Sequence, residues 1–145
     1  MGFGHVAEVR GPVVDVAFPT DDLPELLSAV RIQDDQRGIN LIVEVAQHRG
    51  DNTVRCIAMD STDGIMRGMP AEDTGGPIEV PVGRASLGRI FDVLGRVVDE
   101  GEPLPPDTPT MPIHREPPEY SEQAVQAELF ETGIKVLDLL CPCPE

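Results

Sequence analysis

Short runs in which apolar and polar residues alternate fill much of the first 82 residues. Val14, Val16 and Phe18, for example, alternate with Asp15 and Ala17. A period of two places the apolar side chains on one face of a β-strand. Six such runs separated by turn residues predict a mainly β structure, either a small closed barrel or a sandwich. The predicted strands are Val6–Arg10, Val14–Phe18, Val30–Gln33, Leu41–Val45, Thr53–Met59 and Ile78–Val82.

Glycine and proline punctuate these runs. The chain has 14 glycines and 15 prolines among 145 residues, above the usual combined share of about 12%. This content disfavours a long helical bundle. Turns are predicted at Gly11-Pro12, His48–Asn52 and Thr74–Pro77. Closure of the strands into a barrel is physically favourable because it leaves no edge to pair with another chain.

The charge excludes several classes of partner. The formal net charge is −15, and Lys135 is the one lysine beside ten scattered arginines. Binding to nucleic acid or to an anionic membrane surface needs clustered cations, so neither is expected. No apolar run approaches the roughly 18 residues of a spanning helix, and the N-terminus has no secretion signal. Three cysteines are too few for a disulfide framework, which favours a reducing compartment.

Prolines concentrate in the second part of the chain, where seven of the fifteen lie between Pro103 and Pro118. Proline lacks an N–H and restricts the residue before it, so helix and central strand are both disfavoured there. We therefore predict a barrel domain over residues 1–82 and the incomplete start of a second domain over 83–145. Residues 99–118 form the predicted extended connector inside that second part.

Two helices and a strand are predicted after the barrel. Leu87, Ile90, Phe91 and Leu94 have the spacing of one helix face. Ser86 could cap this helix and Gly95 could end it. The second predicted helix is Ile134–Leu140, with Thr132 as cap and Pro142 as its stop. A short strand is predicted at Ala127–Phe130.

The sequence lacks the motifs that cradle phosphates. A P-loop needs a second glycine before its lysine and a hydroxyl residue after it, and Lys135 has neither. No Rossmann fingerprint follows a strand. Cys141-Pro142-Cys143 lacks a second ligand pair, so we interpret Cys141 as a buried thiol and Cys143 as an exposed one.

Charged residues also offer no clear site. The adjacent acids Asp21-Asp22, Asp34-Asp35, Glu72-Asp73 and Asp99-Glu100 are interpreted as solvated turns. Four arginines could hold an anion, although pairing with neighbouring carboxylates is favoured; they are Arg55, Arg67, Arg84 and Arg89. We therefore predict no catalytic, cofactor-binding or metal-binding residue.

Several long strings cover nearly the whole chain and together resemble one known family. The segments are Gly4–Val16, Leu41–Asp63, Ile78–Gly83, Leu87–Gly95, Pro112–Glu122 and Leu129–Pro142. In this order they resemble the beta subunit of F-type ATP synthase, within the alpha/beta subunit family of rotary ATPases. The strings "EVAQH" and "CIAMDST" favour beta over alpha.

The resemblance implies a six-stranded N-terminal barrel in the crown of an alternating alpha–beta hexamer. It implies that residues from about 83 begin a RecA-like nucleotide-binding domain. For the full-length parent it implies ATP synthesis or hydrolysis coupled to proton transport, with ATP, ADP and Mg²⁺ as ligands and a central gamma stalk. The location implied is a peripheral complex on the cytoplasmic face of a bacterial membrane, or its organelle equivalent. Cys143–Glu145 departs from the family lead-in to the P-loop, so no ATP-contacting residue is carried over.

Three hypotheses follow from the sequence. The favoured one is that the chain is the N-terminal fragment of a beta subunit and is inactive alone. The alternative is a stand-alone, non-catalytic barrel for assembly or decoy interactions. The third is a small-molecule-binding barrel, which requires an interior cavity; Val, Ile and Leu at the inward positions would fill that cavity and argue against it.

Overall fold

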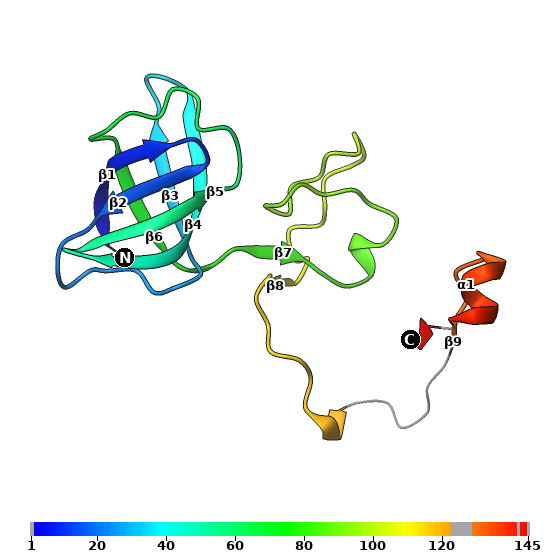
Figure 1. The fold of residues 1–145 in the computed structure, drawn as a ribbon. Coiled ribbons are helices and arrows are strands. Elements are labelled where there is room, and N and C mark those ends of the chain that lie inside the picture. The colour runs from blue at the N-terminus through cyan, green and yellow to red at the C-terminus, as the bar shows by residue number, and fades with distance from the viewer. Residues whose placement is uncertain (1, 123–128, 142, 145) are drawn as a thin grey trace. The chain divides into compact units, whose positions relative to one another are not determined.

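The computed structural model describes residues 2–122, 129–141 and 143–144. Six antiparallel strands close into a barrel in the order β1-β2-β5-β4-β3-β6 (Figure 1). This confirms the predicted mainly β class and decides for the barrel over the sandwich. The strands are β1 (Phe3–Arg10), β2 (Val13–Ala17), β3 (Ser28–Asp34), β4 (Ile39–Gly50), β5 (Thr53–Ala58) and β6 (Pro70–Pro77).

Inward-facing aliphatic side chains fill the barrel. The alternation in the sequence becomes alternation of burial, since Val30 and Ile32 are fully buried while Arg31 between them is exposed. Full burial of one such side chain contributes about 1.5–3 kcal/mol. A packed interior of this kind disfavours the small-molecule hypothesis. The core comprises Val6, Val14, Val16, Phe18, Val30, Ile32, Leu41, Val43, Val45, Val54, Cys56, Met69 and Ala71.

The barrel closes at the seam between β1 and β6. Only three residue pairs form this ladder, running from Phe3 opposite Glu72 to His5 opposite Pro70. Bonds beyond the ladder reinforce it, because the Val6 amide donates to the Met69 carbonyl at 2.9 Å. Gly4 pairs with Ala71 in this ladder, but an added Cβ would collide with the Ala17 carbonyl oxygen and the Phe18 ring at the end of β2. The contact between β1 and the end of β2 therefore requires a residue without a side chain at position 4.

The hairpin between β4 and β5 is tighter than predicted. β4 continues through Gly50, so the predicted turn His48–Asn52 is reduced to two residues. Asp51 and Asn52 have φ of 48° and 57°. Two successive left-handed residues match the twist of the flanking strands, and Asp and Asn tolerate this conformation.

The prediction of the sixth barrel strand was wrong. That strand is Pro70–Pro77, and the predicted turn Thr74–Pro77 lies inside it. Its residues do not alternate, and β3 holds it instead: the Thr74 hydroxyl donates to the Ala29 carbonyl at 2.8 Å. Within the predicted strand Ile78–Val82, β7 (Glu79–Pro81) pairs outside the barrel with β8 (Thr110–Pro112). β8 lies inside the predicted connector 99–118.

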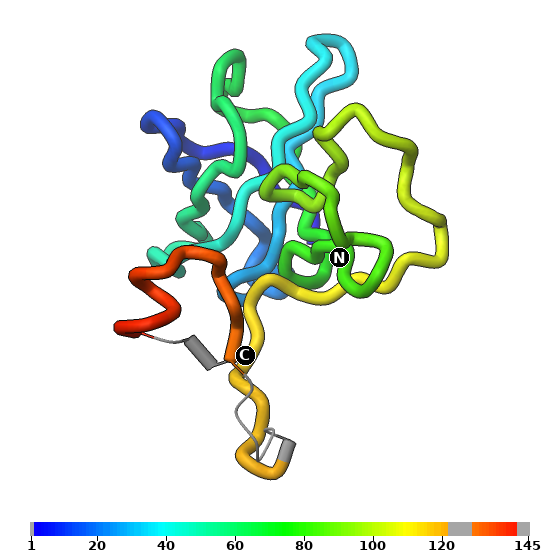
Figure 2. Tube along the Cα trace, turned by 90° about the vertical axis from the view of Figure 1, so that its right-hand side faces the viewer, coloured from blue at the N-terminus to red at the C-terminus, as the bar shows by residue number. Residues whose placement is uncertain are grey.

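The predicted helix over Leu87–Leu94 was also wrong. A short 3-10 helix, η1 (Arg84–Ser86), is followed by irregular loops (Figure 2). Gly88 has φ of 73°, a left-handed conformation that interrupts a right-handed helix. The Asp99 carboxylate also accepts the amide of Ile90 at 3.1 Å. Helical spacing of apolar residues was therefore outweighed by local backbone geometry.

Residues 115–145 form a second compact unit. It contains η2 (Tyr120–Glu122), β9 (Leu129–Phe130), α1 (Lys135–Leu140) and β10 (Cys143–Pro144), with β9 and β10 paired. The predicted helix is confirmed to within one residue. The prediction of Thr132 as its cap was wrong: the N-cap is Ile134, which makes no side-chain cap hydrogen bond, and the Thr132 hydroxyl instead accepts the Ile134 amide at 3.1 Å.

Three finer predictions for this unit have different outcomes. The predicted strand Ala127–Phe130 is confirmed at Leu129–Phe130, and its first two residues lie outside the described residues. Pro142, the predicted stop, also lies outside them. Cys141 is exposed rather than buried, because α1 presents no buried residue for the thiol to pack against.

The close contact of Gly4 with Ala17 and Phe18 predicts the effect of one added methyl group. Gly4→Ala should lower the free energy of unfolding by about 1–3 kcal/mol, because the new Cβ forces backbone or Phe18 to move. Urea denaturation followed by circular dichroism measures this change.

Gly76→Ala is the matched control, since an added Cβ there meets nothing within 4 Å. Its effect should stay within about 0.5 kcal/mol. Equal effects of the two substitutions would contradict the tight contact of Gly4 with Ala17 and Phe18.

Candidate functional site

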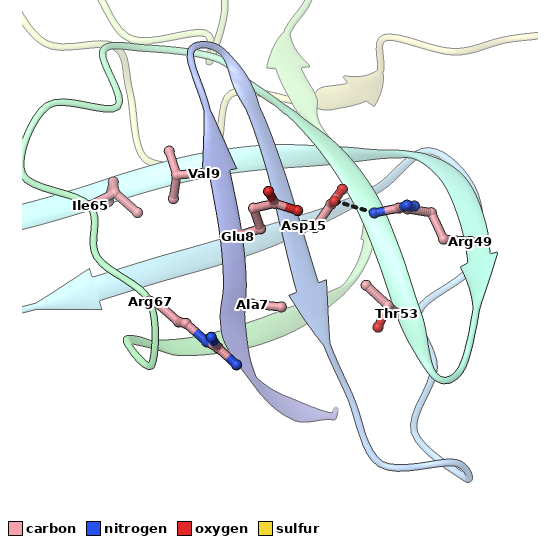
Figure 3. A pocket seen from close by; sticks show the side chains of 8 residues that line it. All are labelled: Ala7, Glu8, Val9, Asp15, Arg49, Thr53, Ile65 and Arg67. Carbon is pink, nitrogen blue, oxygen red and sulfur yellow. Dashed lines mark hydrogen bonds and ion pairs between the residues drawn. The ribbon is translucent and has the colours of Figure 1, made fainter.

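A shallow pocket of about 630 Å³ lies on the outer face of the barrel (Figure 3). Its floor and walls come from β1, β2, β4, β5 and the loop that follows β5. The lining residues are Ala7, Glu8, Val9, Asp15, Arg49, Thr53, Ile65 and Arg67. Acidic and basic side chains are both present, so the pocket is a charged surface rather than an apolar cavity.

Asp15 is the centre of this surface. It lies on β2 between Val14 and Val16, whose side chains face the core, and it stands directly opposite Arg55 on β5. Arg55 donates from Nε to Oδ1 at 2.9 Å and from Nη2 to Oδ2 at 3.0 Å. Arg49 donates from Nη1 to Oδ2 at 2.7 Å (Figure 3). The two arginines cover the carboxylate, and Asp15 is only 3% exposed.

The ion pairs keep these groups charged. Hydrogen bonds from Arg55, and then from Arg49, hold the pKa of Asp15 below its ordinary value, although burial opposes them. Asp15 in turn raises the pKa of Arg55. On the neighbouring β1, the Arg10 hydrogen bond lowers the pKa of Glu8. Carboxylates held ionised by arginines are poor proton donors and acceptors near neutral pH, so this arrangement suits electrostatic contact rather than acid–base catalysis.

A second ion pair organises the loop after β7. Arg89 binds both oxygens of Asp99, at 2.7 and 3.0 Å. Asp99 also accepts the Gly101 amide at 2.9 Å. The Arg89 bond first, and then the Gly101 bond, lower the pKa of Asp99. These bonds are internal to the loop and act as a structural staple.

The four arginines singled out in the sequence are not gathered into one anion site. Arg55 and Arg89 bind carboxylates, as the sequence interpretation favoured. Arg67 lines the pocket, and Arg84 lies in η1. Sequence reasoning missed Asp15 and Arg49. The available signal was an acid between two valines of a strand, but its partners are 34 and 40 residues away.

The adjacent acids behave differently from one another. Asp21 and Asp35 lie in turns, as predicted. Asp34 instead ends β3, and Asp99, although in a bend, is paired with Arg89 rather than solvated, so these two interpretations were wrong. Glu72-Asp73 instead lies inside β6, so its interpretation as a turn was wrong. The strand assignment follows from pairing with β3, which the local sequence does not reveal.

Thiols and potential metal ligands are a further source of chemistry among the residues that the structure describes. Cys56 is buried in the barrel. Burial, with a smaller contribution from Asp15, raises the pKa of Cys56 to about 12, so this thiol stays protonated. Within residues 2–122, 129–141 and 143–144, no three His, Cys, Asp or Glu side chains gather as a metal site would require. Over the same residues, every helix is too short or too polar to traverse a bilayer.

The closed order of strands, the filled interior and the ion pairs on the outer face place residues 3–77 among the small antiparallel β-barrels. Residues 6–75, from β1 into β6, match the family model described as ATP synthase alpha/beta family, beta-barrel domain. Residues 6–75 therefore carry the β-barrel domain of that family.

The Asp15 cluster predicts a pH-dependent stability. At pH 7, Asp15→Asn should lower the free energy of unfolding by about 2–3 kcal/mol, because two arginines lose a charged acceptor. The folded pKa of Asp15 is depressed, so its contribution exists above the unfolded value of about 3.9. It should be lost as the pH falls through the folded pKa.

Urea denaturation of both proteins between pH 7 and pH 3 measures this difference. Asp107→Asn, at an exposed position, is the control and should match the original protein throughout. A difference that stayed constant down to pH 3, or was absent at pH 7, would contradict the role given to Asp15.

Proposed function

We propose that this chain is the N-terminal part of an F-type ATP synthase beta subunit. The barrel would form the crown that holds an alternating alpha–beta hexamer together. The observation that carries the proposal is the closed barrel matched by the family model over residues 6–75. The beta assignment is supported by the string "EVAQH", which lies in β4, and by "CIAMDST", which begins in β5 and continues into the loop after it.

The physical properties of the barrel suit a role in assembly. Closure pairs the edges of all six strands, so the unit is rigid and its outer surface is the part available to neighbours. The chemistry on that surface is ionic, with Asp15, Arg49 and Arg55 fixed in one cluster. A crown must stay intact while other parts of the complex move, and a packed barrel meets that demand.

Catalysis in this proposal belongs to the full-length parent. The parent would make or hydrolyse ATP by rotary catalysis coupled to proton transport, with Mg²⁺-bound nucleotide and a central gamma stalk. Residues from about 83 would begin its RecA-like domain, and the complex would sit peripherally at the cytoplasmic face of a membrane. The support for this is the order of family strings up to Pro142.

A second candidate is a non-catalytic barrel that acts alone as an assembly module. It is favoured by the completeness of the barrel, whose six strands and core lie within residues 3–77. Such a unit can fold without further domains. The two candidates differ in the partner that they require, so one experiment addresses both.

Sedimentation velocity of the chain with purified ATP synthase alpha subunits tests the proposal. We expect a faster-sedimenting complex that contains both proteins, because the crown joins barrels of the two kinds. A control protein of similar size and net charge should not co-sediment. Failure to associate with the alpha subunit would contradict the crown role.

The same preparation of the chain alone should neither hydrolyse ATP nor bind it at millimolar concentration, because it lacks a P-loop. Isothermal titration with Mg²⁺-ATP measures binding. Saturable binding to the isolated chain would overturn the assignment of nucleotide chemistry to the parent.

A further inference from the structure

A groove of about 490 Å³ lies between the segment before β3 and the end of β6. Both sides belong to the unit of residues 1–114. The groove shares no lining residue with the Asp15 pocket. It is lined by Leu23, Pro24, Glu25, Leu26, Leu27, Ser28, Asp73, Gly75, Gly76, Pro77 and His114.

The backbone of this wall is strained at Leu27. Leu27 has φ of 68°, in the left-handed region that bulky residues rarely adopt. Its amide donates to the Val45 carbonyl at 2.8 Å. Nearby, Nε2 of His48 lies 2.8 Å from the carbonyl oxygen of the buried Pro24, at hydrogen-bond distance. The segment therefore contacts β4 at two points, and these contacts hold Leu27 in its strained conformation.

This fixed segment displays apolar side chains to solvent. Leu26 is 56% exposed and Leu27 is 41% exposed. Asparagine or glycine at position 27 would relieve the backbone strain, and a polar residue at position 26 would be better solvated. A strained but ordered backbone that holds leucines exposed to solvent does not favour the stability of the fold. Such an arrangement is characteristic of a contact site.

The charges around the groove define what fits it. Glu25 and Asp73 line it, and neither Lys nor Arg occurs among its described lining residues. His114 approaches Glu44 at 2.8 Å, so its ring nitrogen is directed to that carboxylate. A partner must therefore bring an apolar side chain together with positive charge. A second copy fits poorly, because each chain has a net charge of −15.

We infer that this groove docks a segment of a different protein chain, with an apolar side chain of leucine size flanked by Lys or Arg. The inference deepens the proposed assembly role and rests on it for the source of the partner, a neighbouring subunit. Leu26 and Leu27 supply the apolar contact, and Glu25 and Asp73 receive the positive charges.

A capped peptide of sequence Lys-Leu-Lys-Leu-Lys is the probe. We expect saturable binding to the full chain by fluorescence anisotropy, with amide shifts in NMR spectra confined to residues 23–28 and 73–77. Leu26→Ser should weaken binding at least tenfold. Leu87→Ser is the matched control, since Leu87 is 75% exposed and lies outside the groove, and it should bind as the original chain does.

Peptides with Glu in place of Lys, or with Ser in place of Leu, should bind at least tenfold more weakly. If the Ser-containing peptide bound as tightly as the Leu-containing one, net charge alone would explain the binding, and the inference would be overturned. Equal loss in Leu26→Ser and Leu87→Ser, or shifts elsewhere on the chain, would overturn it as well.

Leu27→Asn separates docking from stability. Because asparagine tolerates the left-handed region, the urea midpoint should be no lower than that of the original chain, while peptide binding weakens. A marked fall in the midpoint would make Leu27 a packing residue and contradict the inference.

The alpha subunit distinguishes this inference from the proposed function. Peptide docking in the groove without association of the alpha subunit would refute the crown role and leave the groove standing. Association with the alpha subunit that Leu26→Ser leaves unchanged would overturn the groove as an assembly contact and retain the proposed function.

Discussion

Closure of β1 onto β6 is the constraint on which the rest of this structure depends. The ladder has only three residue pairs, yet it converts a six-stranded sheet into a barrel without free edges. Closure also creates a dry interior, which small β-branched side chains fill without help from Trp or Tyr. On the other side of β1, Gly4 leaves room for the Ala17 carbonyl and the Phe18 ring at the end of β2. The second unit, by contrast, has no buried residue in its helix α1.

Because side chains fill the interior of the barrel, a surface that contacts other molecules must lie on its outside. Two outer regions differ in chemistry. One is the ionic cluster in which Asp15 joins Arg49 and Arg55, and it contributes to stability by pairing strands β2, β4 and β5. The other is the acidic groove at Leu26 and Leu27, where local strain is retained and apolar surface stays exposed. Under the proposed function, these two regions would be the contacts through which a rigid barrel holds neighbouring chains.

Five of the six barrel strands could be predicted from sequence, because alternation of residues such as Leu41, Val43 and Val45 directly reflects burial on one face. The sixth, Pro70–Pro77, carries almost no alternation and depends on pairing with β3 and β1. The helix predicted over Leu87–Leu94 failed because left-handed Gly88 and the Asp99 staple override periodicity. The Asp15 cluster could not be predicted, because strand register brings together residues that are 34 and 40 positions apart. The empty list of catalytic, cofactor and metal residues stays a prediction.

Residue-resolved amide hydrogen exchange by NMR, across low urea concentrations, tests most directly whether the closed barrel is one cooperative unit. The informative amides are those of Val6 and Asp73, which donate to Met69 and Gly2 across the seam at 2.9 Å. If closure sustains the whole barrel, both should exchange with the same free energy and urea dependence as central amides such as Val43, which report global unfolding. Exchange of Val6 and Asp73 through a low-energy opening with little urea dependence, while Val43 stays protected, would contradict this account.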